Sequence, residues 1–173
     1  EKENVIDGKK IKSGHILLGV ESSGPHSNGY SLIRSILKKH KAPKAIMQVL
    51  LKPTHLYPAP VLELIKKTNV KGMAHITGGG LTENIPRILK KGFVANVDLT
   101  TWKFPKAFLW LQEKGKISTS DMLRIFNCGI GMVCILDKKE ISKAQKIFSA
   151  HKLRSFEIGT ITKGSLQEQI QYS

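Results

Sequence analysis

Apolar residues recur along the chain at two spacings that alternate with each other. Short apolar runs predict buried strands, at 15–20, 70–76, 94–99, 131–136 and 156–161, the last of these being the final strand. Apolar residues three and four positions apart predict amphipathic helices, at 30–40, 61–68, 81–91 and 104–115 and after Ser118 and Asp137. Strands that alternate with helices indicate an α/β domain, with an α+β-like mixed sheet packed against helices in layers.

Turn-forming and capping residues refine the ends of these elements. Asp7-Gly8 is a hairpin-type turn signal, so 5–11 is expected to contribute to an opening pair of strands. The helix 61–68 is expected to begin only after the prolines of the middle segment, Pro53, Pro58 and Pro60. Ser118 and Asp137 are expected to cap the helices that follow them.

The composition fits one globular domain with a large positive charge. A chain of 173 residues, 40% of them hydrophobic, can form one full core, and its apolar runs are far shorter than a membrane span. The formal net charge of +15 raises a nucleic-acid-binding module as an alternative. The stretch between Glu21 and Glu63 has no acidic residue, and its basic residues are Arg34, Lys38, Lys39, Lys41, Lys44 and Lys52.

The kind of basic residue argues against that alternative. The excess is almost wholly lysine, 24 residues against four arginines, and aromatic residues make up only 6% of the chain. Specific recognition of phosphates and bases favours the arginine fork and stacking rings. We therefore favour a solvated lysine surface over a nucleic acid groove, and we expect no membrane partner.

The two cysteines carry no metal-site pattern. Cys128 and Cys134 lie six positions apart, without histidine or cysteine partners at metal-ligand spacing. Both are expected to be buried, reduced thiols, and no metal ligands are predicted in this chain. No Asn-x-Ser/Thr sequence occurs either, and together these features favour a cytoplasmic location.

Residues 22–30 form a loop rich in glycine and small polar residues, between a predicted strand and a predicted helix. Backbone N–H groups and the positive end of the helix dipole point out of such a junction, and both favour a bound anion. Ser27 or Asn28 alone would suffice to cap the helix, but the loop holds more polar residues and glycines than a cap needs. Small residues let a ligand approach the backbone closely, so we favour contact with a phosphorylated small molecule.

Residues 75–84 repeat this arrangement at a second junction. Three consecutive glycines at 78–80 are costly in backbone entropy, and the structural alternative is a bulge or a tight crossing of chains. A lone His75 would more often be a hydrogen-bonded core residue. Beside Thr77, Glu83 and Asn84 it becomes a candidate for proton transfer or phosphate contact, because histidine titrates near neutral pH.

The known nucleotide-binding fingerprints are absent. There is no G-x-x-x-x-G-K-[ST] sequence, and Glu83 and Cys134 stand where a third fingerprint glycine would be needed. Neither a P-loop nor a dinucleotide-binding fold is predicted. A third glycine segment, 126–132, precedes a strand and could equally be a simple turn.

Three long segments, and two that flank them, resemble one enzyme family in the same order. The segments are SSGPHSNGYSLIR from Ser22, MAHITGGGLTENIPRIL from Met73, FNCGIGMV from Phe126, DGKKIKSGHILLG from Asp7 and IGTITKG from Ile158. They resemble aminoimidazole ribonucleotide synthetase, also called phosphoribosylformylglycinamidine cyclo-ligase. Two departures are visible, since His15 stands where this family usually has aspartate and Lys90-Lys91 stand where it usually has Leu-Pro.

The resemblance implies that residues 1–173 are a single domain, the C-terminal, substrate-binding half of a two-domain ligase. An N-terminal domain, absent here, would form the homodimer and hold most of the ATP and magnesium, often with potassium. The family reaction uses ATP to activate the formyl oxygen of formylglycinamidine ribonucleotide, so that the amidine nitrogen closes the imidazole ring in de novo purine biosynthesis. The isolated domain is expected to be inactive.

The resemblance also implies roles for the two loops. His75 would be the catalytic acid or base, or would stabilise the transferred phosphoryl group. The substrate and its phosphate would contact His26, Ser27, Asn28, Gly29, Thr77, Gly78, Gly79, Gly80 and Asn84. Related ATP-dependent families share this domain, among them formylglycinamidine synthase, selenophosphate synthetase, thiamine-monophosphate kinase and a hydrogenase maturation factor, so another phosphorylated substrate stays open.

Overall fold

The computed structural model describes residues 5–164, 167 and 169–173. Its strands are β1 (Ile16–Glu21), β2 (Gly72–His75), β3 (Phe93–Val97), β4 (Ile130–Leu136), β5 (Ser155–Lys163) and β6 (Ile170–Tyr172). They form a six-stranded sheet in the order β2-β4-β1-β5-β3-β6. Neighbouring strands are antiparallel except for β3 and β6, which are parallel, so the predicted mixed sheet is confirmed.

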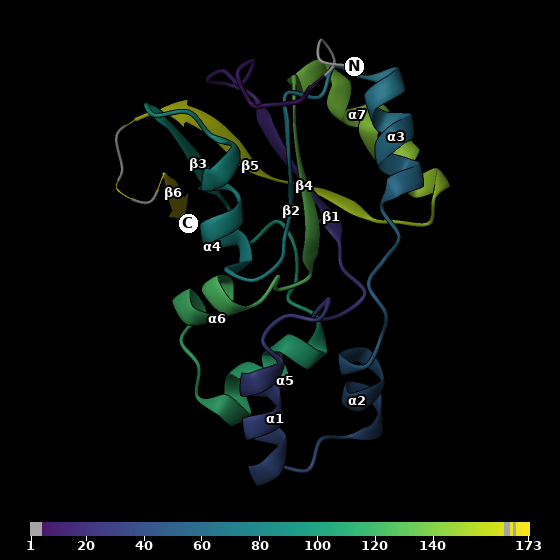
Figure 1. The fold of residues 1–173 in the computed structure, drawn as a ribbon, viewed down its shortest axis with the longest axis vertical. Coiled ribbons are helices and arrows are strands. Elements are labelled where there is room, and N and C mark those ends of the chain that lie inside the picture. The colour runs from purple at the N-terminus through teal and green to yellow at the C-terminus, as the bar shows by residue number, and fades with distance from the viewer. Residues whose placement is uncertain (1–4, 165–166, 168) are drawn as a thin grey trace.

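Helices cover both faces of the sheet and extend beyond one end of it (Figure 1). The helices are α1 (Tyr30–Lys39), α2 (Lys44–Leu50), α3 (Pro58–Lys67), α4 (Gly80–Asn84), α5 (Lys106–Gly115), α6 (Thr119–Ile125) and α7 (Ile141–Ala150). Helix α3 packs on α7 and α4 packs on α6, while α1 and α2 pack on α5 in a separate helical lobe. No helix among the described residues is long and apolar enough to cross a membrane.

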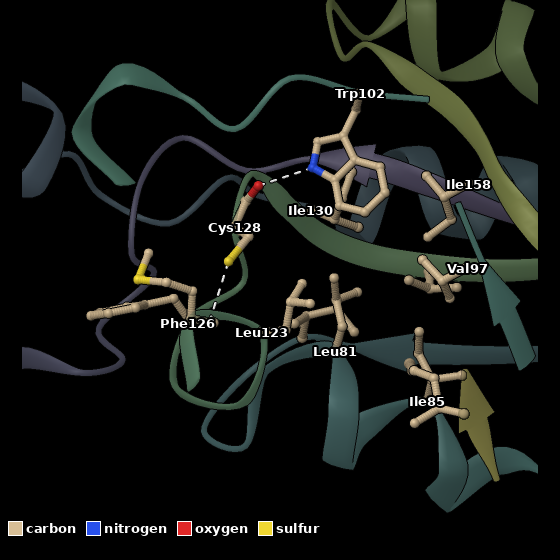
Figure 2. Close-up of a cluster of buried hydrophobic side chains, with 14 of the residues drawn as sticks. Leu81, Ile85, Val97, Trp102, Leu123, Phe126, Cys128, Ile130 and Ile158 are labelled. Atoms are coloured by element: carbon tan, nitrogen blue, oxygen red, sulfur yellow. Dashed lines mark hydrogen bonds between the residues drawn. The ribbon is translucent and has the colours of Figure 1, made fainter. Parts of the chain in front are cut away.

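Alternate residues of β1 face two different apolar clusters. Leu17 belongs to the cluster beneath α4 and α6, whereas Leu18 and Val20 belong to the cluster beneath α3 and α7. Figure 2 shows the first cluster, where the Trp102 indole N–H donates to the Cys128 carbonyl at 3.0 Å. Both cysteines are buried and free, as predicted.

The chain before β1 contains no strand among its described residues, so the predicted opening strand pair is wrong. Gly8 has a φ of 76°, and the Ile11 N–H donates to the Gly8 carbonyl at 3.0 Å. This bond closes a turn instead of starting a ladder. Ile11 still enters the core, with only 2% of its surface exposed, which explains the apolar pattern that suggested a strand.

The prolines place the helix ends differently from the prediction. Helix α3 begins at Pro58, because a proline in the first turn removes an N–H that would have no helical partner. Pro86 instead follows the end of α4 and opens a short 3₁₀ turn, Pro86–Ile88, so the predicted helix 81–91 is too long. Helix α2 and strand β6 were not predicted from the sequence.

The two predicted caps had different outcomes. Ser118 is confirmed, since its Oγ accepts the Asp121 N–H at 3.1 Å. Asp137 makes no cap bond, and the prediction was wrong. Its carboxylate instead contacts Lys71 Nζ at 3.0 Å and His15 Nε2 at 3.1 Å.

The basic residues of the acid-free stretch are all exposed, and they lie on α1 and α2 or directly after them. This helical lobe is separate from the sheet in Figure 1. The preference against a nucleic acid partner stays a prediction.

Candidate functional site

Three loops lie together at one end of the strands of the sheet. Strands β1 and β2 are each antiparallel to β4, which lies between them. The C-terminal ends of β1 and β2 therefore lie beside the N-terminal end of β4. The loops there are 22–29, 76–79 and 126–129, and we call this end of the strands the loop end of the sheet. A Cβ built on Gly78 would lie 3.7 Å from Asn28 Oδ1, so the two loops singled out in the sequence are in contact.

Asn127 ties the first and third loops together. Its side chain is fully buried, and its Oδ1 accepts hydrogen bonds from the Ser22 hydroxyl and the Gly129 N–H, both at 2.9 Å. Its Nδ2 donates to the Gly24 carbonyl at 2.8 Å. Asn127 was not predicted as a site residue, although it lies within the FNCGIGMV segment that carries the resemblance.

The first loop has an unusual backbone. His26 and Ser27 have φ angles of 51° and 67°, in the left-handed region that non-glycine residues rarely adopt. Gly29 begins α1 without any side-chain cap bond, so neither Ser27 nor Asn28 acts as the cap that offered the simpler interpretation. Strained backbone of this kind persists only where surrounding structure holds it, and it occurs often at ligand-binding sites.

The second loop is built around Asn84. This side chain is 5% exposed, and its Nδ2 donates to the Gly78 carbonyl at 3.1 Å and to the Gly80 carbonyl at 2.8 Å. Gly80 is required by close packing, because a Cβ there would lie 2.1 Å from the Leu123 carbonyl oxygen. The predicted tight crossing thus accounts for Gly80. It does not account for the exposed Gly78, where a Cβ would meet only Asn28 Oδ1, at the ordinary contact distance of 3.7 Å.

Four rings gather beside these loops. The ring centroid of Tyr57 lies 5.9 Å from those of both His26 and His75, and 6.1 Å from that of His55. The Tyr57 hydroxyl donates to the Glu21 carbonyl at 2.7 Å. Gly131 makes room for this arrangement, because a Cβ there would lie 2.1 Å from Tyr57 Oη and 2.6 Å from His26 Cε1. We call His26, His55, Tyr57 and His75 the ring cluster.

His26 is a neutral residue within the ring cluster. Its Nε2 accepts the Ser23 N–H at 3.0 Å, so the neutral ring carries its proton on Nδ1. Nδ1 is buried and has no hydrogen-bond partner among the described residues. Burial, followed by the charges of His55 and His75, lowers the pKa of His26 to about 4. Burial and then Glu21 raise the pKa of Tyr57, so both rings are uncharged at neutral pH.

A cavity of about 280 Å³ opens against the ring cluster. Its lining residues are His55, Leu56, Tyr57, Pro58, Val61, His75 and Met132. His75 is the last residue of β2, so it borders both this cavity and the second loop. Within the described part of the chain, no group of three or more His, Cys, Asp or Glu residues could hold a metal ion.

Residues 12–170 match the family described as AIR synthase related protein, C-terminal domain. This chain belongs to that family. It is similar to the phosphoribosylformylglycinamidine cyclo-ligase of Staphylococcus aureus (strain bovine RF122 / ET3-1), with 44% identity over 170 residues, 94% of this chain and 50% of the relative. The enzyme of the same name from Paraburkholderia phymatum is 44% identical over 168 residues, 93% of this chain and 47% of the relative. The chain thus spans about half the length of the curated relatives that it matches.

Solved structures show the same fold at low sequence identity. E. coli HypE, a hydrogenase maturation protein, has a TM-score of 0.68 and 15% identity, over 95% of this chain and 48% of that one. A thiamine-monophosphate kinase from Stenotrophomonas maltophilia K279a has a TM-score of 0.68 and 13% identity, over 99% of this chain and 54% of the kinase. A hydrogenase maturation protein HypE in complex with ATP has a TM-score of 0.63 and 17% identity, over 94% of this chain and 46% of that one. At these identities the likeness is one of fold.

In this AIR synthase related domain, the predicted site residues lie together but differ in exposure. His75, Ser27 and Gly78 are exposed, Asn28, Gly29, Thr77 and Gly79 are half-buried, and His26, Gly80 and Asn84 are buried. Their contacts with a ligand stay predictions. His55, Tyr57 and Gly131 were not predicted as site residues, because only the folded chain brings them to the site.

Proposed function

We propose that this chain is the substrate-binding half of an ATP-dependent cyclo-ligase, which converts formylglycinamidine ribonucleotide to aminoimidazole ribonucleotide. The convergence of the three loops at one end of the sheet carries the proposal, since it brings the first turn of α1 and the exposed Gly78 together. The resemblance to cyclo-ligases over half of their length supplies the reaction.

Each loop has a chemical task in this proposal. Ser27, Asn28 and Gly29 hold the ribose phosphate, because the first N–H groups of α1 are unpaired within the helix and favour an anion. His75 borders both the phosphate loops and the cavity, so it is positioned to exchange a proton with the reacting end of the substrate.

ATP and magnesium belong to the other half of the enzyme in this proposal. The described residues hold no cluster suited to a metal ion, so we assign no step of the reaction to a metal held here. The N-terminal domain of the same enzyme would bind ATP and magnesium, with potassium where required, and would form the homodimer. This division predicts that the isolated chain binds substrate but does not turn it over.

A chimaera tests the proposal directly. The chain would replace the C-terminal half of the S. aureus cyclo-ligase, and ring closure would be measured with purified protein. We expect activity, and we expect Ser27→Asp to raise KM at least tenfold because its carboxylate repels the substrate phosphate. Ser142→Asp, on the exposed face of α7, is the matched control and should leave KM unchanged. A folded chimaera without activity would contradict the proposal.

Ligand binding distinguishes this substrate from that of a related family. A ligand raises the melting temperature only of a protein that binds it, so the chain would be melted with formylglycinamidine ribonucleotide, thiamine phosphate or ATP. The proposal expects the largest shift with formylglycinamidine ribonucleotide. A larger shift with thiamine phosphate would assign the chain to a different substrate.

A further inference from the structure

The cavity beside the ring cluster has walls of one chemical kind. Tyr57, Pro58, Val61 and Met132 supply aromatic and apolar surface, and no Lys, Arg, Asp or Glu lines it. His55 and His75 are its titratable side chains apart from the bonded Tyr57. No lysine or arginine lines the cavity to bind a second phosphate or a carboxylate. A flat polar group could instead pack against the aromatic ring of Tyr57 and hydrogen-bond to the imidazoles of His55 and His75.

The back wall of this cavity is rigid. The Tyr57 hydroxyl is held by the Glu21 carbonyl at 2.7 Å, and the absence of a side chain at Gly131 lets Tyr57 and His26 pack against β4. Because His26 is neutral, it adds no positive charge that would repel a protonated amidine. The ring face of Tyr57 attracts such a cation.

Resting on the proposed function, we propose that this cavity holds the nitrogen-bearing end of the phosphorylated substrate and that His55 positions that end. The phosphate lies against the first and second loops, and His75 marks the passage from those loops into the cavity. An imidazole can donate through one ring nitrogen and accept through the other, which matches an amidine or an imidazole ring. His55 thereby fixes the orientation of the nitrogen-bearing end, which binding of the phosphate alone would not fix.

The experiment compares a whole ligand with its phosphate half. Binding of formylglycinamidine ribonucleotide and of ribose 5-phosphate to the chain would be measured by calorimetry. We expect His55→Ala to weaken ribonucleotide binding about tenfold and ribose 5-phosphate binding less than twofold, because one hydrogen bond is lost from the nitrogen-bearing end only. His55→Gln should restore part of the affinity, since its amide also donates and accepts. His40→Ala, an exposed histidine after α1, is the control.

Imidazole NMR provides a readout that a merely structural role would not change. The ribonucleotide should shift the His55 ring resonances, and ribose 5-phosphate should leave them in place. The resonances of His151, which contacts Glu63 at 2.8 Å on another part of the surface, should not move with either ligand.

The outcomes separate the two proposals. Equal weakening of both ligands by His55→Ala, or no weakening of either, overturns the subsite. If the chain instead binds thiamine phosphate and His55→Ala weakens it selectively, the proposed reaction fails and the subsite stands. If the chain binds none of these phosphate esters, both proposals fail.

Discussion

Two buried histidines, His15 and His26, lie beyond opposite ends of β1. They differ in whether both ring nitrogens have hydrogen-bond partners. His15 is 6% exposed; its Nδ1 accepts the Lys12 N–H at 3.1 Å and its Nε2 donates to Asp137 at 3.1 Å. Lys71 completes the network by contacting the same carboxylate at 3.0 Å. His26 is 5% exposed, but its Nδ1 has no partner among the described residues.

This difference distinguishes a histidine with a complete structural network from one that the proposed function places in the ligand site. A buried polar atom without a partner costs free energy, so folded chains keep few of them. His15 forms a complete network at an end of the sheet where no ligand is proposed. His26 keeps an open donor beside a cavity and within the strained first loop. Burial alone would not have distinguished them, since both are almost fully covered.

The largest predicted effect concerns the glycine that makes room for the ring cluster. Gly131→Ala should lower the free energy of unfolding by about 3 kcal/mol, because the new Cβ would overlap Tyr57 and His26. Urea denaturation followed by circular dichroism measures this. The control is Gly14→Ala at the His15 end, where φ is 89° but no atom lies within 4 Å, so only about 1 kcal/mol of backbone strain is expected. Equal costs would show that the ring cluster can rearrange freely.

Asn127→Ala should have the next largest effect. It leaves Ser22 and the Gly24 carbonyl without their buried partner, at a cost of roughly 2–3 kcal/mol. Asn96→Ala is the control, because this half-buried side chain bonds only to Thr160 and Thr162 on the neighbouring strand and not to a loop of the site. Hydrogen exchange should also speed up in 22–29 in the first variant. Unchanged exchange there would mean that Asn127 does not hold the loop.

The sequence predicted those parts of the site that depend on local order. Both loops were recognised because each follows an apolar run and precedes a helical pattern, and His75 was recognised because it adjoins the glycines. Ser118 was predicted as a cap because capping involves residues only three positions apart. These interactions are encoded within a few neighbouring residues.

The remaining parts depend on contacts that no local pattern encodes. Asn127 bonds to Gly24 across 103 positions, because the antiparallel pairing of β4 with β1 brings the start of β4 beside the end of β1. His55 and Tyr57 lie within the proline-rich segment 53–60, whose pattern predicts only a break. Asp137 illustrates the opposite error, since a residue suited to capping was used by Lys71 and His15 instead.

His15→Ala tests the comparison itself. The variant should lose about 1–2 kcal/mol of stability, because two hydrogen bonds disappear while Asp137 keeps Lys71. Its affinity for the ribonucleotide should stay within twofold of the original chain. His26→Ala should instead lower that affinity by more than tenfold. If His15→Ala changed affinity as strongly, the two ends of the sheet would not differ in function.

A separate prediction is a loss of stability in mild acid. Burial lowers the pKa of both histidines below the ordinary value of 6.5, to about 4 for His26. The unfolded chain therefore binds more protons than the folded chain as pH falls, so the stabilisation present above pH 6.5 is lost toward pH 4. Denaturation between pH 7 and 4.5 should show this decline, with a shallower slope in His26→Gln.

The pH range of that measurement separates the two histidines from Asp137, the carboxylate that contacts His15. The Asp137 pKa is lowered from its ordinary 3.8, first by its hydrogen bond with Lys71, so its contribution is lost only as pH falls below that value. Above pH 4.5 this carboxylate stays charged in both states of the chain. A rise in stability over the same range would mean that the folded chain binds protons more readily than the unfolded chain. His26 would then be charged when folded, and the ring cluster would repel a protonated amidine instead of accepting it.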